Sequence, residues 1–173
     1  MAKLTRGIDH VGVTVPDVEE ATMFFKKAFH AKISYDNKKL GDEPQQGEDV
    51  EKTLGLNKGA KVIHIRILSF ENGSGIELFH FKDTEQREPV IASDLGVQHL
   101  AFYVDDIQET AKHFVEAGGE LLTEPGELLG DVENGAGEFV YGRAPWGMII
   151  ELISYNPNQL DYPEDSEAKR FTP

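Results

Sequence analysis

Two histidines and two glutamates carry the strongest chemical signal in the sequence. His10 and His99 lie 89 residues apart, and Glu77 and Glu151 lie 74 residues apart, each where the surrounding residues repeat. Two imidazoles and two carboxylates suit one divalent cation (Zn, Ni, Co, Mn or Fe), because the carboxylates balance its charge. Such an ion would act as a Lewis acid on a small substrate with vicinal oxygens, while a glutamate moves the proton.

The repeat predicts that these residues sit in two similar modules. HVGVTVPDVEE from residue 10 aligns with HLAFYVDDIQE from residue 99, and IEL at 76–78 aligns with IEL at 150–152. In each repeat, alternating apolar residues predict a strand. An aspartate suited to a helix N-cap follows, and apolar residues at helical spacing after it predict a helix. Three more strands are predicted after the helix. The expected strands are 8–15, 31–36, 61–69 and 75–81, then 97–104, 119–123, 137–142 and 147–154.

The predicted fold class is therefore α+β, with two βαβββ modules forming a cupped mixed sheet and helices on its outer face. The first module is expected at 1–82 and the second at 97–155, with a polar connector at 83–96 and an acidic tail at 156–173. The two repeat shifts differ by 15 residues, which places an insertion at 37–59 in the first module. Its composition fits a lid, a dimer contact or a solvated loop.

Strand alternation predicts that the four residues share one face. Neighbouring residues on a strand point to opposite sides, and the apolar side must pack against the helix. By this rule His10 and His99 point away from the helix, and so do Glu77 and Glu151. A sheet that curls around this face would bring them together as ligands of one metal.

Four further side chains are weaker candidates for contacting a substrate in the cup. The isoleucines at 63, 65 and 67 are expected on the helix side, which sends His64 and Arg66 into the cup. Tyr103 has the same strand parity as His99, and Arg143 is the other basic residue expected nearby.

The composition excludes several classes of function. The 173 residues contain 31 acidic and 17 basic side chains, and the net charge of −14 repels nucleic acids and anionic membranes. There are no cysteines, so a thiolate zinc site, a cysteine nucleophile and a disulfide scaffold are excluded. The longest apolar run is five residues, at 100–104, and the N-terminus resembles no signal peptide. We therefore expect a cytoplasmic protein with a small-molecule substrate.

Four segments of the sequence resemble the vicinal oxygen chelate superfamily, which includes glyoxalases, bleomycin resistance proteins and dioxygenases. They are IDHVGV at 8–13, GIELF at 75–79, GVQHLAFYVDD at 96–106 and PWGMIIELI at 145–153. The resemblance implies paired modules that close around one metal. Glyoxalase I has the closest ligand pattern, because its order of His, Glu, His and Glu matches His10, Glu77, His99 and Glu151. The resemblance also implies that Glu151 acts as the base, with Glu77 as the second catalytic carboxylate.

The expected activity is that of a lactoylglutathione lyase type of enzyme, a lyase or isomerase working by proton abstraction and a metal-bound enediolate. One alternative is a methylmalonyl-CoA epimerase-like enzyme, which would use the same metal-assisted proton abstraction. Another is an Fe(II) ring-cleavage dioxygenase, which would not need Glu77 as a ligand. A small-molecule-binding resistance protein without catalysis is the alternative outside enzymes. Glutathione is compatible as a thiol cofactor, although no basic residues are assigned to its carboxylates. The resemblance further implies a homodimer, with the site built within one chain or across a swapped pair.

Overall fold

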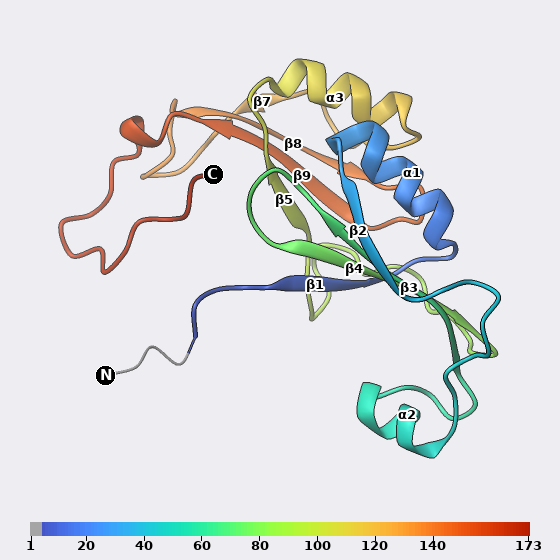
Figure 1. Ribbon diagram of the computed structural model, residues 1–173. Coiled ribbons are helices and arrows are strands. Elements are labelled where there is room, and N and C mark those ends of the chain that lie inside the picture. Colours follow the sequence, from blue (N-terminus) through green and yellow to red (C-terminus); the bar gives the residue numbers. More distant parts are fainter. Residues whose placement is uncertain (1–4) are drawn as a thin grey trace. The chain divides into compact units, whose positions relative to one another are not determined.

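The computed structural model describes residues 5–173, which divide into two compact units. Unit 1 comprises the described residues up to Lys26 together with His30–Arg87, and unit 2 comprises Lys27–Phe29 and Glu88–Pro173. The division after Arg87 lies within the segment 83–96 that the sequence analysis treats as a connector. Figure 1 shows the elements of both units.

Unit 1 contains a four-stranded mixed sheet with the strand order β1-β4-β3-β2. β1 and β4 are parallel, and the other neighbours are antiparallel. The elements of this unit are β1 (His10–Thr14), α1 (Val18–Phe29), β2 (Lys32–Lys38), α2 (Glu48–Leu54), β3 (Lys61–Ser69) and β4 (Gly75–Lys82). Only the end of α1, Lys27–Phe29, is grouped with unit 2. Apart from α2, this is the predicted strand, helix and three further strands.

Helix α1 begins where the sequence predicts a cap. The Asp17 carboxylate accepts hydrogen bonds from the backbone N–H groups of Glu19 and Glu20, which the first turn of a helix leaves without partners. The apolar stripe of the helix is buried, and Phe25 packs edge-on against Phe70 with ring centroids 6.3 Å apart. Capping and apolar burial therefore fix α1 against its sheet.

Helix α2 lies in the 37–59 insertion and was not predicted. It has only seven residues, and none of them is buried, so no apolar periodicity marks it. Acidic residues in its first turn and Lys52 in its last turn complement the helix dipole, and Gly55 ends it in a left-handed conformation. Figure 1 shows α2 on the connection between β2 and β3.

Unit 2 repeats the pattern of unit 1 around the strand order β5-β9-β8-β6. β5 and β9 are parallel, and β8 is antiparallel to β9 and to a short extra strand, β7. The elements are β5 (Leu100–Tyr103), α3 (Ile107–Glu116), β6 (Glu120–Leu121), β7 (Gly126–Glu127), β8 (Gly137–Arg143) and β9 (Ile149–Tyr155). The protein is therefore an α+β protein built from two βαβββ modules, as predicted.

Close packing of α3 on its sheet depends on a glycine. Phe114 of α3 is fully buried, and a Cβ atom at Gly142 of β8 would lie 2.6 Å from its ring. Only a residue without a side chain allows this approach.

No helix within residues 5–173 has the length and apolar character needed to cross a membrane.

Candidate metal and proton-transfer site

The first half of the site lies in unit 1, where β1 and β4 run in parallel. Their register pairs His10 with Gly75 and Gly12 with Glu77, so the His10 and Glu77 side chains share one face of the sheet. Nε2 of His10 lies 3.2 Å from Oε2 of Glu77. Nδ1 of the same ring lies 2.8 Å from Oδ2 of Asp9. The ring is thus oriented with Nε2 toward the glutamate.

The second half lies in unit 2, where β5 and β9 repeat this arrangement. Glu151 pairs with Ala101, and His99 immediately precedes β5 on the same face. Nε2 of His99 lies 3.0 Å from Oε2 of Glu151, and Nδ1 lies 2.8 Å from Oε1 of Gln98. The Gln98 amide is itself oriented, because its Nε2 donates to the Ala92 carbonyl at 2.7 Å. We call the two pairs, His10–Glu77 and His99–Glu151, the half-sites.

The half-sites have the chemistry of metal ligands. A neutral imidazole that donates from Nδ1 to an acceptor carries a lone pair on Nε2. In each half-site that lone pair faces a carboxylate oxygen, and two acceptors at this distance repel unless a cation lies between them. The cation can be a proton or a metal ion. A ring held through Nδ1 with Nε2 directed at the ion is the arrangement usual for histidine ligands.

Local charges and burial shift the pKa of groups in both half-sites. Burial raises the pKa of Glu151, whose side chain is 12% exposed, and interactions with His99 and Arg170 oppose the rise. The hydrogen bond to Asp9 is the main cause that raises the pKa of His10. A buried glutamate with a raised pKa accepts a proton more readily than an exposed one.

Each half-site brings together two of the four predicted ligands. Over residues 5–173, the structure shows no group of three or more His, Asp or Glu side chains that could hold a metal ion. The complete set of His10, Glu77, His99 and Glu151 therefore remains a prediction from the sequence repeat.

Tyr141 belongs to the second half-site and was not predicted from the sequence. It pairs with Glu151 across β8 and β9, and its ring packs edge-on to His99 at 5.2 Å between centroids. Burial, followed by the charge of Glu151, raises the pKa of the Tyr141 hydroxyl, which therefore stays protonated as a donor. Strand parity along 137–142 was the signal that could have found it. In unit 1 the equivalent partner of Glu77 is Ile67, so the half-sites differ here.

Two of the weaker candidates lie on the same face as Glu151. Tyr103 pairs with Ile153, two residues beyond Glu151, and its hydroxyl donates to the Tyr155 carbonyl at 2.7 Å. Arg143 pairs with Ile149 at the other side of Glu151 and is half-buried. Tyr103 thus holds the strand pair together, while Arg143 lines the face.

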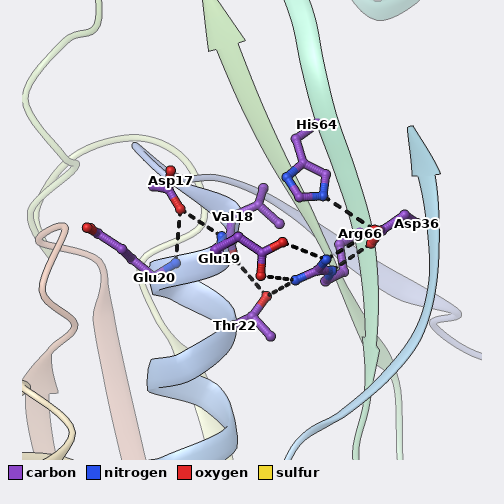
Figure 2. Close-up of polar contacts among 8 residues, drawn as sticks. All are labelled: Asp17, Val18, Glu19, Glu20, Thr22, Asp36, His64 and Arg66. Carbon is purple, nitrogen blue, oxygen red and sulfur yellow. Dashed lines mark hydrogen bonds and ion pairs between the residues drawn. The ribbon is translucent and has the colours of Figure 1, made fainter. Parts of the chain in front are cut away.

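The prediction that His64 and Arg66 enter the cup was wrong. Arg66 pairs with Leu78 in the β3–β4 register, which places it on the face that packs against α1. Figure 2 shows its guanidinium between Asp36 and Glu19. The N–O distances are 2.6 Å to Asp36 and 2.8 Å to Glu19. Nε2 of His64 lies 3.6 Å from Oδ2 of Asp36. Both faces of β3 are buried, so its isoleucines did not mark the helix side.

Comparisons with known proteins identify the family of the chain. The profile of the Glyoxalase/Bleomycin resistance protein/Dioxygenase superfamily matches residues 7–152. A 2-epi-5-epi-valiolone epimerase from Actinomyces sp is 29% identical over 170 residues, covering 96% of this chain and 88% of the epimerase.

Solved structures show the same fold. A glyoxalase family protein from Bacillus cereus aligns with a TM-score of 0.68 and 23% identity, covering 89% of this chain and 96% of the other. Glyoxalase I from Zea mays aligns with a TM-score of 0.56 and 20% identity, covering 87% of this chain and 46% of the maize chain.

Proposed function

Because the chain belongs to the Glyoxalase/Bleomycin resistance protein/Dioxygenase superfamily, we propose that it is a metal-dependent enzyme that moves a proton on a small oxygen-rich substrate. The proposed reaction is epimerisation at a carbon next to a carbonyl group. The observation that carries the proposal is the His99–Glu151 half-site, where an oxygen of a buried carboxylate lies 3.0 Å from Nε2 of an oriented imidazole.

We propose that the two half-sites together hold one divalent metal ion. The imidazoles of His10 and His99 offer Nε2, while Glu77 and Glu151 offer oxygens and balance the charge. When bound, such an ion supplies Lewis acidity that makes the C–H bond beside a carbonyl more acidic. Each half-site belongs to one unit, so a complete set needs both units, from one chain or from two copies in a homodimer.

The two glutamates are the proposed proton carriers. Glu151 is suited to take the proton because burial raises its pKa. Glu77 offers a second carboxylate at the equivalent place in the other module, with its side chain 16% exposed. Epimerisation requires the proton to leave one face of the carbon and return to the other, and two separate carboxylates provide for both transfers.

The match to the Actinomyces epimerase supports epimerisation over the other reactions in the superfamily. It covers 96% of this chain, so it takes in the 37–59 insertion and most of the 156–173 tail. The likeness to maize glyoxalase I, at 20% identity, supports the fold alone.

A lactoylglutathione lyase type of reaction is the second candidate. The ligand order His10, Glu77, His99 and Glu151 favours it, because this order resembles that of glyoxalase I. It uses the same proton abstraction but requires a glutathione hemithioacetal as substrate.

Solvent exchange tests the proposal directly. The protein is incubated with 2-epi-5-epi-valiolone in D2O, and we expect deuterium at the epimerised carbon by NMR. A chelator should abolish the exchange, and added Zn²⁺ or Ni²⁺ should restore it. Glu151→Gln should slow it by about a hundredfold or more. Glu127→Gln, on the exposed strand β7, is the matched control and should leave it unchanged.

Two outcomes would contradict epimerisation. Exchange that persists in Glu151→Gln, or that is indifferent to the chelator, would remove the proposed roles of the glutamate and the metal. Turnover of a glutathione hemithioacetal without exchange on the ketone would favour the second candidate.

A further inference from the structure

The C-terminal tail, residues 156–173, folds back onto unit 2. A short 3-10 helix at Pro157–Gln159 turns the chain, and the backbone N–H of Asp161 donates to the Val132 carbonyl at 3.0 Å. Leu160 packs against the apolar cluster that contains Ile153 and Tyr155. In Figure 1 the tail is the red segment that follows β9 and ends at the label C. An acidic segment without periodicity therefore has a defined place in the fold.

Arg170 is the most firmly held side chain of the tail. Its guanidinium forms an ion pair with Glu133 and lies over the Tyr155 ring, with Cζ 4.6 Å from the ring centroid. Its backbone N–H donates to the Tyr162 hydroxyl at 3.1 Å, and Tyr155 is 5% exposed. The aromatic ring against one face of the guanidinium and the ion pair at one of its nitrogens restrict its orientation.

The Arg170–Glu133 pair lies on the side of β9 that carries the half-site. Glu151, Ile153 and Tyr155 alternate along β9 and point to the same face. Arg170 lies over the Tyr155 ring and pairs with Glu133, which places the pair on this face. The side chains of Arg170 and Glu133 are 38% and 33% exposed, so both retain groups that a ligand can reach.

We propose that the Arg170–Glu133 pair is a substrate-binding element of the His99–Glu151 half-site, selecting neutral substrates that carry neighbouring hydroxyl groups. The inference rests on the proposed function and names the substrate class of the same site.

The charges and donors of the pair argue for this class. Arg170 is neutralised by Glu133, so the pair offers an anionic substrate little net attraction. A guanidinium has five N–H donors, and a carboxylate has two oxygens with free lone pairs beyond those used in one ion pair. Donors beside acceptors match neighbouring hydroxyl groups, each of which both donates and accepts.

Binding measurements on the full chain test the inference separately from catalysis. The neutral probe is inosose, a cyclic ketone rich in hydroxyl groups, and the anionic probe is cyclohexanecarboxylate; dissociation constants are measured by calorimetry. Arg170→Met keeps the aliphatic stem over Tyr155 and should weaken inosose binding by about tenfold or more. Lys169→Gln removes the neighbouring tail charge and is the matched control, expected to stay within about twofold.

A second variant distinguishes a specific loss of binding from a loss of structure in Arg170→Met. Glu133→Gln leaves Arg170 with an unbalanced charge, so inosose binding should weaken while cyclohexanecarboxylate binding strengthens. Opposite changes for the two probes are not expected from a misfolded protein.

The outcomes separate this inference from the proposed function. Equal inosose affinities for Arg170→Met and Lys169→Gln would overturn it, even in an active epimerase. If the Arg170 and Glu133 variants change inosose binding as expected but the protein shows no deuterium exchange, the role of the Arg170–Glu133 pair is supported and epimerisation is contradicted. A wild-type protein that binds no inosose overturns it as well.

Discussion

Nε2 of His99 lies 3.0 Å from Oε2 of Glu151, while the other nitrogen of the ring is held by Gln98, the preceding residue in the chain. His10 has the same relationship to Glu77, with Asp9 in the role of Gln98. In both modules, therefore, a residue one position before the histidine sets the direction of the ring. Sequence neighbours orient the imidazole ring, and the parallel strand supplies the carboxylate that faces Nε2.

Gln98 is expected to control metal affinity without being a ligand. Gln98→Leu removes the acceptor for Nδ1 of His99, so the ring loses the contact that directs Nε2 at Glu151. Loss of such a partner typically weakens metal binding tenfold to a hundredfold, and we expect about tenfold for Zn²⁺. A competition titration with a chromophoric chelator measures it.

Gln108→Leu, on the exposed side of α3, is the matched control for that titration. The expectation fails if Gln98→Leu and Gln108→Leu bind Zn²⁺ equally, or if His99→Ala binds it as tightly as the wild type.

The sequence predicted the face of β1 correctly because polar and aliphatic residues alternate there, so the direction of His10 followed from parity. β9 is buried on both faces, and the direction of Glu151 was predicted correctly there because IEL at 150–152 repeats IEL at 76–78. In β3 both faces are buried, and a charged side chain is accommodated against α1 because Glu19 and Asp36 neutralise it. Alternation alone could not reveal this, since the partners of Arg66 lie 47 and 30 residues away in the sequence.

The packing of the tail and the helix α2 were not predicted, for a different reason. Both lack a repeating apolar pattern, because few of their side chains are buried. The tail is held by single contacts such as Arg170 over Tyr155, and α2 by its C-terminal cap at Gly55 and its terminal charges. Contacts of this kind depend on the folded positions of distant residues and leave no periodic signal.

Arg66 is expected to contribute strongly to stability. Its side chain is 7% exposed, and Arg66→Met would leave Asp36 and Glu19 facing each other without a cation. Breaking a buried pair from one side costs about 3–5 kcal/mol, and the exposure of Glu19 reduces this to about 2–3 kcal/mol in the free energy of unfolding. Urea denaturation measures it.

Lys112→Met is the control for Arg66→Met. Lys112 and Glu116 form an exposed pair at 3.8 Å on α3, so its loss should cost under about 0.5 kcal/mol. A similar effect of the two variants would show that the Arg66 cluster is energetically equivalent to a surface pair.

The same cluster predicts how stability depends on pH. Hydrogen bonds from Arg66 lower the pKa of Asp36 and of Glu19 below their ordinary values of 3.8 and 4.5. The folded protein therefore favours the ionised carboxylates, and the stability they add is full above these values and lost as the pH falls through the lower, folded-state values. Urea unfolding at pH 7, 5 and 3 should show wild type and Arg66→Met converging at acid pH. A gap that widens on acidification would contradict this origin.

Gly137 is expected to hold β8 and β9 in the register that the second half-site requires. A Cβ atom at Gly137 would lie 1.9 Å from the Ser154 carbonyl oxygen and 2.6 Å from Cα of Tyr155, and backbone atoms of a central strand cannot move aside. Gly137→Ala should therefore open the β8–β9 pair and lower the free energy of unfolding by about 2 kcal/mol or more. Gly126→Ala is the matched control, since a Cβ there meets nothing within 4 Å. Urea denaturation of both variants measures the difference, and equal stabilities would show that the two strands can separate at Gly137 without loss.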